Sequence, residues 1–161
     1  MLSPTMFSSE SSEHYTPRWL INTLGEFDLD PCSSPDKRVI AKRHCIGLNN
    51  EDGLRVVWFG RIFINPPYGK GLDKWVSKGL MFRKSSELIY LLPARTDTEW
   101  FHQLARAKPT ILFFKGRLKF DTPNGSAKNS APFPSMLVHV GKNKVEFIER
   151  VKHLGIVSEV I

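Results

Sequence analysis

Residues 61–69, Arg61-Ile62-Phe63-Ile64-Asn65-Pro66-Pro67-Tyr68-Gly69, decide the fold class of this chain. The first four form a short apolar run typical of a buried strand, and the two prolines end it, since proline cannot donate to a sheet. Apolar residues at helical spacing follow and predict a helix over 72–80. A strand, a tight loop and a helix in this order are the repeating unit of an α/β fold.

The same alternation continues on both sides of this unit. The sequence predicts further strands at 27–30, 87–92, 110–114 and 135–140. It predicts helices that begin at Thr16-Pro17, in the capping box 96–99, and at Asn143. The polar segment from 31 to about 50 is expected to mix a short helix with loop. The pattern predicts an α/β three-layer sandwich with a mostly parallel central sheet, and the two consecutive late strands predict an antiparallel hairpin at one edge.

Length and composition predict one domain. The chain has 161 residues, of which 41% are hydrophobic and 24% charged, which is ordinary for a globular protein. Residues 1–13 are Ser-rich without apolar periodicity and are expected to form a flexible N-terminal arm, with a single domain over 14–161. The polar start lacks the features of a signal peptide, and no apolar run could span a bilayer, so we expect a cytoplasmic protein without membrane contact.

The distribution of charge indicates a polyanionic partner. The net charge is +7, but residues 1–36 carry −5 and residues 37–161 carry +12. A basic body of this kind is typical of nucleic-acid-binding proteins, although many basic proteins bind none. Cys32 and Cys45 have one neighbouring histidine, His44, which gives too few ligands for a metal site.

The segment Asn65-Pro66-Pro67-Tyr68 offers a specific chemistry. It lies at the carboxyl end of a central strand, where parallel sheets bind ligands. The prolines stiffen the backbone and leave the Asn65 side-chain oxygen and the Pro66 carbonyl as fixed acceptors beside the Tyr68 ring. Two acceptors beside an aromatic face suit an exocyclic amino group on a planar ring. The alternative is a proline-rich turn that only ends the strand.

Further motifs accompany this one over roughly residues 14–140. They are Tyr15-Thr16-Pro17, Asp28-Leu29-Asp30-Pro31-Cys32, 92–98 (LPARTDT), 116–120 (GRLKF) and 131–135 (APFPS). Together with Asn65-Pro66-Pro67-Tyr68-Gly69 they resemble the small phage-type DNA N6-adenine methyltransferases. Asn-Pro-Pro-Tyr alone is shared with enzymes that methylate cytosine N4 or protein glutamine, so the combination carries the specificity.

The resemblance implies a Rossmann-like methyltransferase fold of reduced size, with S-adenosylmethionine as cofactor and double-stranded DNA as partner. A site-specific adenine methyltransferase would flip the target base out of the duplex and transfer the methyl group directly to N6. In that reading Asn65 and Pro66 orient the amino group, Pro67 stiffens the loop and Tyr68 stacks on the base.

The resemblance also implies a cofactor site. Its residues would be Tyr15, Thr16, Pro17, Asp30, Pro31, Cys32, Asp52 and Asn65. Thr16 is equally explained as a helix cap, and Asp30 as a turn residue. No Gly-x-Gly follows Asp30, and no clear second strand ends in an acid that could bind a ribose. Asp52 is the nearest candidate for the cofactor's adenine, and an ordinary Asp-Gly turn is its alternative.

DNA contacts are expected from the long loop and its flanks. Phe133 or Phe120 would supply a second stacking wall, with Phe133 favoured because of its neighbouring prolines, and either could instead be core. Lys115, Arg117 and Lys119 alternate with period two, so they would form a phosphate-contacting face or a solvated strand edge. Arg95 follows a strand end and is either a cofactor or phosphate ligand or a surface ion-pair partner.

Two rival functions remain open at this point. The same fold could methylate another nitrogen, in cytosine N4 or protein glutamine, although the positive body disfavours a protein substrate. The other rival is a catalytically weak, methyltransferase-like module that only binds DNA, which the missing Gly-x-Gly makes conceivable. The sequence does not indicate an oligomeric state.

Overall fold

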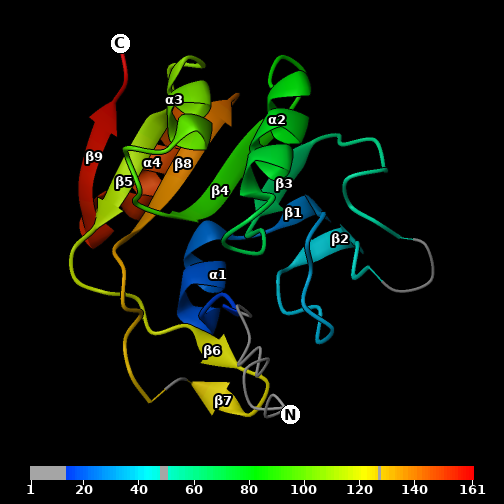
Figure 1. Cartoon of the computed structure of the whole chain (residues 1–161), viewed down its shortest axis with the longest axis vertical. Coiled ribbons are helices and arrows are strands. Elements are labelled where there is room, and N and C mark those ends of the chain that lie inside the picture. Colours follow the sequence, from blue (N-terminus) through cyan, green and yellow to red (C-terminus); the bar gives the residue numbers. More distant parts are fainter. Residues whose placement is uncertain (1–13, 48–50, 127) are drawn as a thin grey trace, which may run out of the picture.

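The computed structural model describes residues 14–47, 51–126 and 128–161, so the expected arm at 1–13 lies outside the described residues. The chain forms a mixed seven-stranded sheet in the order β2-β1-β3-β4-β8-β5-β9. Its strands are β1 (Phe27–Asp30), β2 (Ala41–His44), β3 (Arg61–Ile64), β4 (Glu87–Pro93), β5 (Thr110–Phe114), β8 (Ser135–Gly141) and β9 (Gly155–Glu159). In Figure 1, β2 and β9 lie at the two sides of this sheet.

Four helices and a small ribbon complete the described fold. The helices are α1 (Arg18–Leu24), α2 (Leu72–Met81), α3 (Glu99–Ala105) and α4 (Lys144–Val151), which continues as the 3-10 turn η2 (Lys152–Leu154). The ribbon pairs β6 (Asp121–Thr122) with β7 (Gly125–Ser126) and lies below α1 in Figure 1. The predicted mixed α/β architecture is confirmed, and its sheet is half parallel and half antiparallel, with three pairings of each kind among the described strands.

The predicted antiparallel hairpin at the edge of the sheet is wrong, because β8 lies inside the sheet. Strands β2, β1, β3 and β4 are parallel, whereas β8 is antiparallel to both β4 and β5. The predicted strands at 110–114 and 135–140 do pair, but β8 lies inside the sheet and β9 forms the edge. Residues 135–140 are all buried and therefore need neighbours on both sides, while β9 alternates with exposed residues and suits an edge.

The helices divide between two core clusters. Phe63, Ile89 and Leu91 pack in one cluster with apolar residues of α1 and α4. The alternate residues of the same strands, such as Ile62 and Leu88, pack in the other cluster with residues of α2 and α3. Both faces of β3 and β4 are thus buried, which explains their continuous apolar runs.

Three local predictions are wrong in detail. Residue Pro17 is the N-cap of α1, so Thr16 does not cap this helix, and Thr98 rather than Thr96 caps α3 by accepting from Phe101 N. The polar segment after 31 contains a strand, β2, in place of a short helix. Its side chains are partly or fully exposed at the sheet edge, so no apolar alternation marked it in the sequence.

None of the helices in the described residues has the length and apolar character needed to cross a membrane.

Candidate active site

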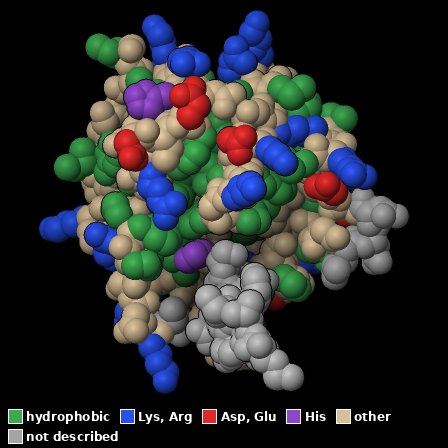
Figure 2. All heavy atoms as spheres, in the orientation of Figure 1, with side chains coloured by type: hydrophobic (Ala, Val, Ile, Leu, Met, Phe, Trp, Pro, Cys, Tyr) green, Lys and Arg blue, Asp and Glu red, His purple; other side chains and the backbone are tan. Residues whose placement is uncertain are grey.

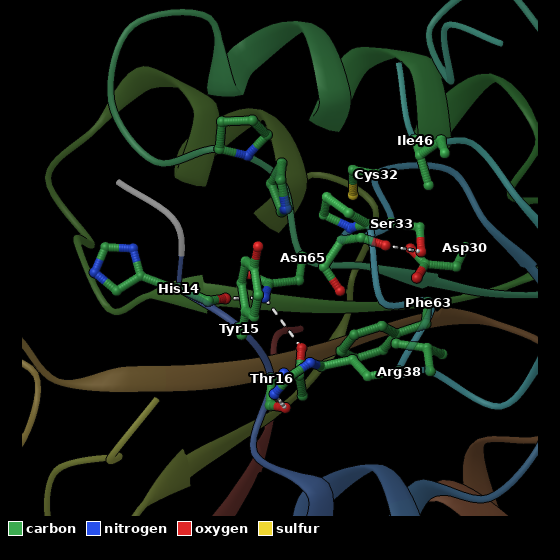
Figure 3. Close-up of a pocket in the computed structure, with 15 residues that line it drawn as sticks. His14, Tyr15, Thr16, Asp30, Cys32, Ser33, Arg38, Ile46, Phe63 and Asn65 are labelled. Carbon is green, nitrogen blue, oxygen red and sulfur yellow. Dashed lines mark hydrogen bonds between the residues drawn. The ribbon is translucent and has the colours of Figure 1, made fainter. Parts of the chain in front are cut away.

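The candidate site lies where the order of the strands reverses. The chain continues from β1 to β2 on one side and from β3 to β4 on the other, so the loops after β1 and β3 diverge and leave a crevice between them. A cavity of about 330 Å³ occupies this place (Figure 3). Its volume falls within the range of small-molecule sites.

The cavity gathers most of the predicted cofactor residues. Those that line it are Tyr15, Thr16, Asp30, Cys32 and Asn65. Pro66 and Pro67, which were predicted as part of the catalytic segment, line it as well. The lining residues that the sequence did not indicate are His14, Ser33, Ser34, Pro35, Arg38, Val39, Ile46 and Phe63. Pro17 and Pro31 are buried beside it and do not line it. Ser33, Ser34 and Pro35 extend the loop after Asp30, so proximity to that residue could have identified them.

Asn65 is held by its amide nitrogen. Its Nδ2 donates to the backbone oxygen of His14 at 2.7 Å and to Oγ1 of Thr16 at 3.1 Å. Because the His14 oxygen can only accept, the amide nitrogen must face it, and this fixes the orientation of the side chain. Among the described residues no donor reaches Oδ1 of Asn65. The site therefore presents an oriented and unpaired acceptor.

Asp30 is a buried carboxylate at the tip of β1. Its residue is 2% exposed, and its Oδ2 lies 3.7 Å from Nδ1 of His44. Burial raises the pKa of Asp30, although hydrogen bonds from His44, Ser33 and the Cys32 backbone partly offset this effect. A desolvated carboxylate on a cavity wall can bind a cationic ligand group, which would replace the lost hydration.

The other acidic candidate, Asp52, does not line the cavity. Its Oδ1 accepts from Leu54 N at 2.9 Å, which is the geometry of an Asx turn. The following Gly53 presses on the loop after β1, because a Cβ at this position would lie only 1.7 Å from the Pro31 oxygen. The geometry thus favours the Asp-Gly turn, and β2 ends at His44 without an acid.

Cys32 lines the cavity as a neutral thiol. Burial raises the pKa of Cys32 well above its ordinary value, and the nearby Asp30 charge raises it further. A protonated thiol is a poor nucleophile, so this residue is suited to packing rather than covalent chemistry. Within the described part of the chain, no group of three or more His, Cys, Asp or Glu side chains could hold a metal ion.

Tyr68 belongs to an aromatic box, which we define as Tyr68, Phe120 and Phe133. Phe133 and Phe120 meet the Tyr68 ring edge-on at 5.5 and 6.2 Å between centroids. Both phenylalanines also pack with the core, so the core interpretation is confirmed, and their role as a stacking wall stays a prediction. The imidazole of His14 stacks on Tyr68 inside this box. Figure 3 shows His14 and Asp30 on opposite sides of Asn65.

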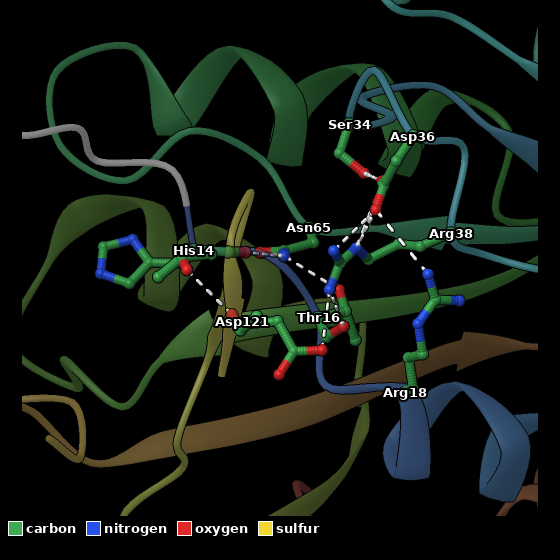
Figure 4. A network of polar contacts seen from close by, with 10 residues as sticks. His14, Thr16, Arg18, Ser34, Asp36, Arg38, Asn65 and Asp121 are labelled. Atoms are coloured by element: carbon green, nitrogen blue, oxygen red, sulfur yellow. Dashed lines mark hydrogen bonds and ion pairs between the residues drawn. The ribbon is translucent and has the colours of Figure 1, made fainter. Parts of the chain in front are cut away.

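Arg38 ties the N-terminal segment to the cavity wall, and no sequence signal indicated it. Its side chain is 6% exposed and pairs with Asp36 at 2.6 Å and Asp121 at 2.8 Å. It also donates to the Thr16 oxygen (Figure 4). Its guanidinium lies over the Tyr15 ring, 4.7 Å from the centroid. The Arg38 guanidinium therefore holds Thr16, whose hydroxyl accepts a hydrogen bond from Asn65.

The predicted basic face is exposed but is not a strand. Chain geometry becomes irregular after Phe114, and Gly116 has a positive φ of 81°. Lys115, Arg117 and Lys119 nevertheless point outward and line a shallow hollow with Trp19 and His153. Leu118 and Phe120 between and after them are buried. Figure 2 shows Lys and Arg side chains spread around the visible face rather than gathered in one patch.

Arg95 lies at the rim of the aromatic box. Its guanidinium is 5.8 Å from the centroid of the Phe133 ring, and the residue is exposed. It therefore stands beside the box rather than in the cavity, a position suited to a contact outside the pocket.

Comparison with known proteins gives two findings. A family model described as DNA N-6-adenine-methyltransferase (Dam) matches residues 5–158. A curated protein from Escherichia phage T1, named DNA N-6-adenine-methyltransferase, is 26% identical over 135 residues. That similarity covers 79% of this chain but only 55% of the phage protein, so the chain spans about half the length of this relative.

Proposed function

Because the chain belongs to the DNA N-6-adenine-methyltransferase (Dam) family, we propose that it transfers a methyl group to the N6 amino group of adenine in double-stranded DNA. The observation that carries this proposal is the position of Asn65. Its anchored amide lines a ligand-sized cavity, and in Figure 3 it lies between Asp30 and His14, whose ring stacks on Tyr68 of the aromatic box. Among the described residues no donor pairs with its Oδ1. For methyl transfer, the methyl donor would bind in the cavity on one side of Asn65, and the target amino group would lie on the other side.

The cavity fits S-adenosylmethionine as the methyl donor, which supplies an electrophilic methyl group on a sulfonium when bound. Asp30 would accept from its ammonium group, since a desolvated carboxylate gains most from a cationic partner. Tyr15, Thr16 and Cys32 would line the same ligand, with the apolar side chains of Val39, Ile46 and Phe63 around it.

The reacting nitrogen would be oriented by the chain's own acceptors. Oδ1 of Asn65 and the carbonyl of Pro66 would each accept one amino proton of the flipped base. Holding both protons directs the nitrogen lone pair toward the cavity and helps its change to tetrahedral geometry. Pro67 keeps the loop rigid, and Tyr68 would stack on the base. No covalent enzyme intermediate is required, which agrees with the neutral state of Cys32.

DNA would be held outside this pocket by exposed cations. Lys115, Arg117 and Lys119 would contact phosphates, and Arg95 at the rim of the box would contact the backbone next to the flipped base. We further propose that residues 14–161 form one domain of a reduced Rossmann-like, three-layer methyltransferase fold, because the ligand cavity lies at the switch point of its sheet.

The proposal is tested by incubating unmethylated DNA with the protein and S-adenosylmethionine. Mass spectrometry of the digested nucleosides should find N6-methyladenine, and long-read sequencing should locate it. Detection of N4-methylcytosine in place of N6-methyladenine would show that the protein methylates cytosine. Calorimetry with S-adenosylmethionine should show binding heat, and its absence together with intact DNA binding would indicate a module that only binds DNA.

A further inference from the structure

The aromatic box of the described structure is filled by the protein's own side chain. The His14 ring stacks on Tyr68 with centroids 4.9 Å apart and an interplanar angle of 21°. Phe120 and Phe133 contact the His14 ring edge-on, with distances of 4.9 and 5.3 Å between ring centroids. His14 thus makes the contacts that a planar nitrogen heterocycle would make in this box. We propose that His14 occupies the place of the target base and must leave before a base can enter.

This inference rests on the proposed function and adds a gating step to it. Stacked atoms lie about 3.5 Å apart, so a base sandwiched between two rings holds their planes about 7 Å apart. The observed 4.9 Å between the His14 and Tyr68 centroids leaves no room for such a base. The base and His14 therefore compete for one face of Tyr68.

Tyr68 is the fixed partner in this competition. Its hydroxyl donates to the Leu91 oxygen in β4, and its ring packs against both core clusters. The backbone near His14 is also anchored, by Asn65 at the His14 oxygen and by the bridge between Tyr15 and Asp121. Rotation of the imidazole about its own side-chain bonds would leave these backbone anchors intact. Its departure would keep Asn65 in position.

The position of His14 makes it a gate with a defined energetic effect. Stacked aromatic pairs contribute about 0.5–1.5 kcal/mol beyond their buried area, so removal of the imidazole should tighten DNA binding about two- to tenfold. A larger ring in its place should weaken binding. The step does not alter the methyl-transfer chemistry, because Asn65 is bonded to the backbone of His14 and not to its ring.

The chemical shifts of the His14 ring protons report directly whether the imidazole lies in the aromatic box. In the free protein the His14 ring protons should resonate upfield of those of the exposed His102, because three aromatic rings surround the His14 imidazole. A duplex carrying the site found in the methylation map, added with S-adenosylhomocysteine, should move them to the values of an exposed histidine. Upfield resonances that persist in the DNA complex would overturn the inference.

Variants give the second measurement. His14→Ala should bind that duplex about two- to tenfold more tightly and His14→Trp more weakly, while the control His102→Ala should bind like the parent. Equal affinity of all four proteins, with methyl transfer intact, would overturn the gate and leave the proposed function standing. Absence of adenine methylation by the parent and by His14→Ala would instead overturn the proposed function, and the gate with it.

Discussion

The two ends of the strands β1, β3 and β4 treat buried charge in opposite ways. At the carboxyl end, Asp30 and Asn65 face a cavity with acceptor capacity to spare. At the amino end, Arg61 and Glu87 lie against the end of β8 and bond to each other and to His139 and Asn143. The carboxyl ends of these strands, which we call the open edge, can receive a ligand. At the amino ends, which we call the closed edge, the buried charged groups pair with one another.

The amino edge is a tight ionic network. Arg61 Nε lies 3.1 Å from Glu87 Oε2, which also accepts from Asn143. Arg61 Nη1 donates to the backbone oxygens of Leu24, the last residue of α1, and of Glu26. Burial raises the pKa of Glu87, but hydrogen bonds from His139 and Asn143 and the charge of Arg61 outweigh it, so the pKa lies below its ordinary value. Among the described residues, Arg61 Nη2 and the neighbouring Ser86 Oγ are buried there without a hydrogen-bond partner.

The contrast between Asp30 and Glu87 separates function from stability. Both carboxylates are almost fully buried, yet the pKa of one is raised and the pKa of the other is lowered. The difference is whether the protein itself supplies the compensating cation. Glu87 has Arg61, whereas Asp30 has only partial compensation and faces a cavity that can hold one.

The largest expected effect comes from breaking the closed edge. Glu87→Leu leaves the Arg61 charge without an anion, so the free energy of unfolding should fall by about 3–5 kcal/mol. Methyl transfer per folded molecule should persist. Urea unfolding measures the loss, and Glu149→Leu, which removes an exposed pair with Lys152, should cost less than about 1 kcal/mol. Equal losses in both variants would contradict the contrast between the edges.

At the open edge, Asn65→Ala should lower the rate of methyl transfer by about 10² or more, because the amino group loses its oriented acceptor. Affinity for S-adenosylmethionine should change little, and loss of the two hydrogen bonds of the Asn65 amide should lower the free energy of unfolding by about 1–3 kcal/mol. The matched variant Asn143→Ala removes an amide from the closed edge and should lose about 1 kcal/mol of stability while it retains the rate. Single-turnover rates and calorimetry check both, and an active Asn65→Ala protein would contradict the assignment.

Tyr68 sharpens the picture of the open edge. Tyr68→Ala should bind a duplex with 2-aminopurine at the target position about ten- to a hundredfold less tightly, since stacking on an aromatic ring is worth roughly 1–3 kcal/mol per base. It should also lose the fluorescence rise that follows unstacking of this base. Tyr68→Phe loses only the bond to the Leu91 oxygen and should keep most activity. Equal brightening with all three proteins would exclude Tyr68 as the stacking wall.

The exposed cations beyond the open edge should contribute to affinity in a salt-dependent manner. Replacing Lys115, Arg117 and Lys119 together by Gln should flatten the dependence of log affinity on log salt by about one unit for each phosphate contact removed. Fluorescence anisotropy over a salt series measures the slope. The same triple change at Lys84, Lys108 and Lys142, which are exposed and line neither the cavity nor the hollow beside Lys115, serves as the charge-matched comparison. Equal salt slopes for the two triple variants would show that Lys115, Arg117 and Lys119 do not contact DNA phosphates.

The smallest effects separate the two carboxylates by pH. Burial raises the pKa of Asp30, so affinity for S-adenosylmethionine should fall as the pH is lowered through that pKa, by at most about tenfold per pH unit. Asp30→Asn should bind weakly at every pH. Glu87, with a lowered pKa, should contribute stability above its ordinary value of 4.5 and lose it as the pH falls through the folded pKa. A parent affinity independent of pH would contradict the role of Asp30.

Sequence reasoning succeeded where local pattern and packing agree. The strand at 61–64 and the turn that follows were identified because their apolar run is buried on both faces and the prolines end it. It failed for β2, whose polar edge residues carry no alternation signal, for the short edge strand β9, and for the insertion of β8, which depends on pairing across the sheet. Asp30 and Asn65 were found because they follow strands, while Arg38 and His14 reach the site only through tertiary contacts.

The interior position of β8 sets an order for assembly of the sheet. Strand β4 pairs with β3 within one short crossover, but its other edge is covered only when Glu87 meets Gly141, 54 positions later in the chain. Until residues 135–141 have been synthesised, β4 presents seven residues, all buried in the finished fold, with an unpaired edge. A nascent or truncated chain that ends before Ser135 therefore carries an aggregation-prone strand next to an almost complete ligand crevice, and this strand is covered only once β8 has been synthesised.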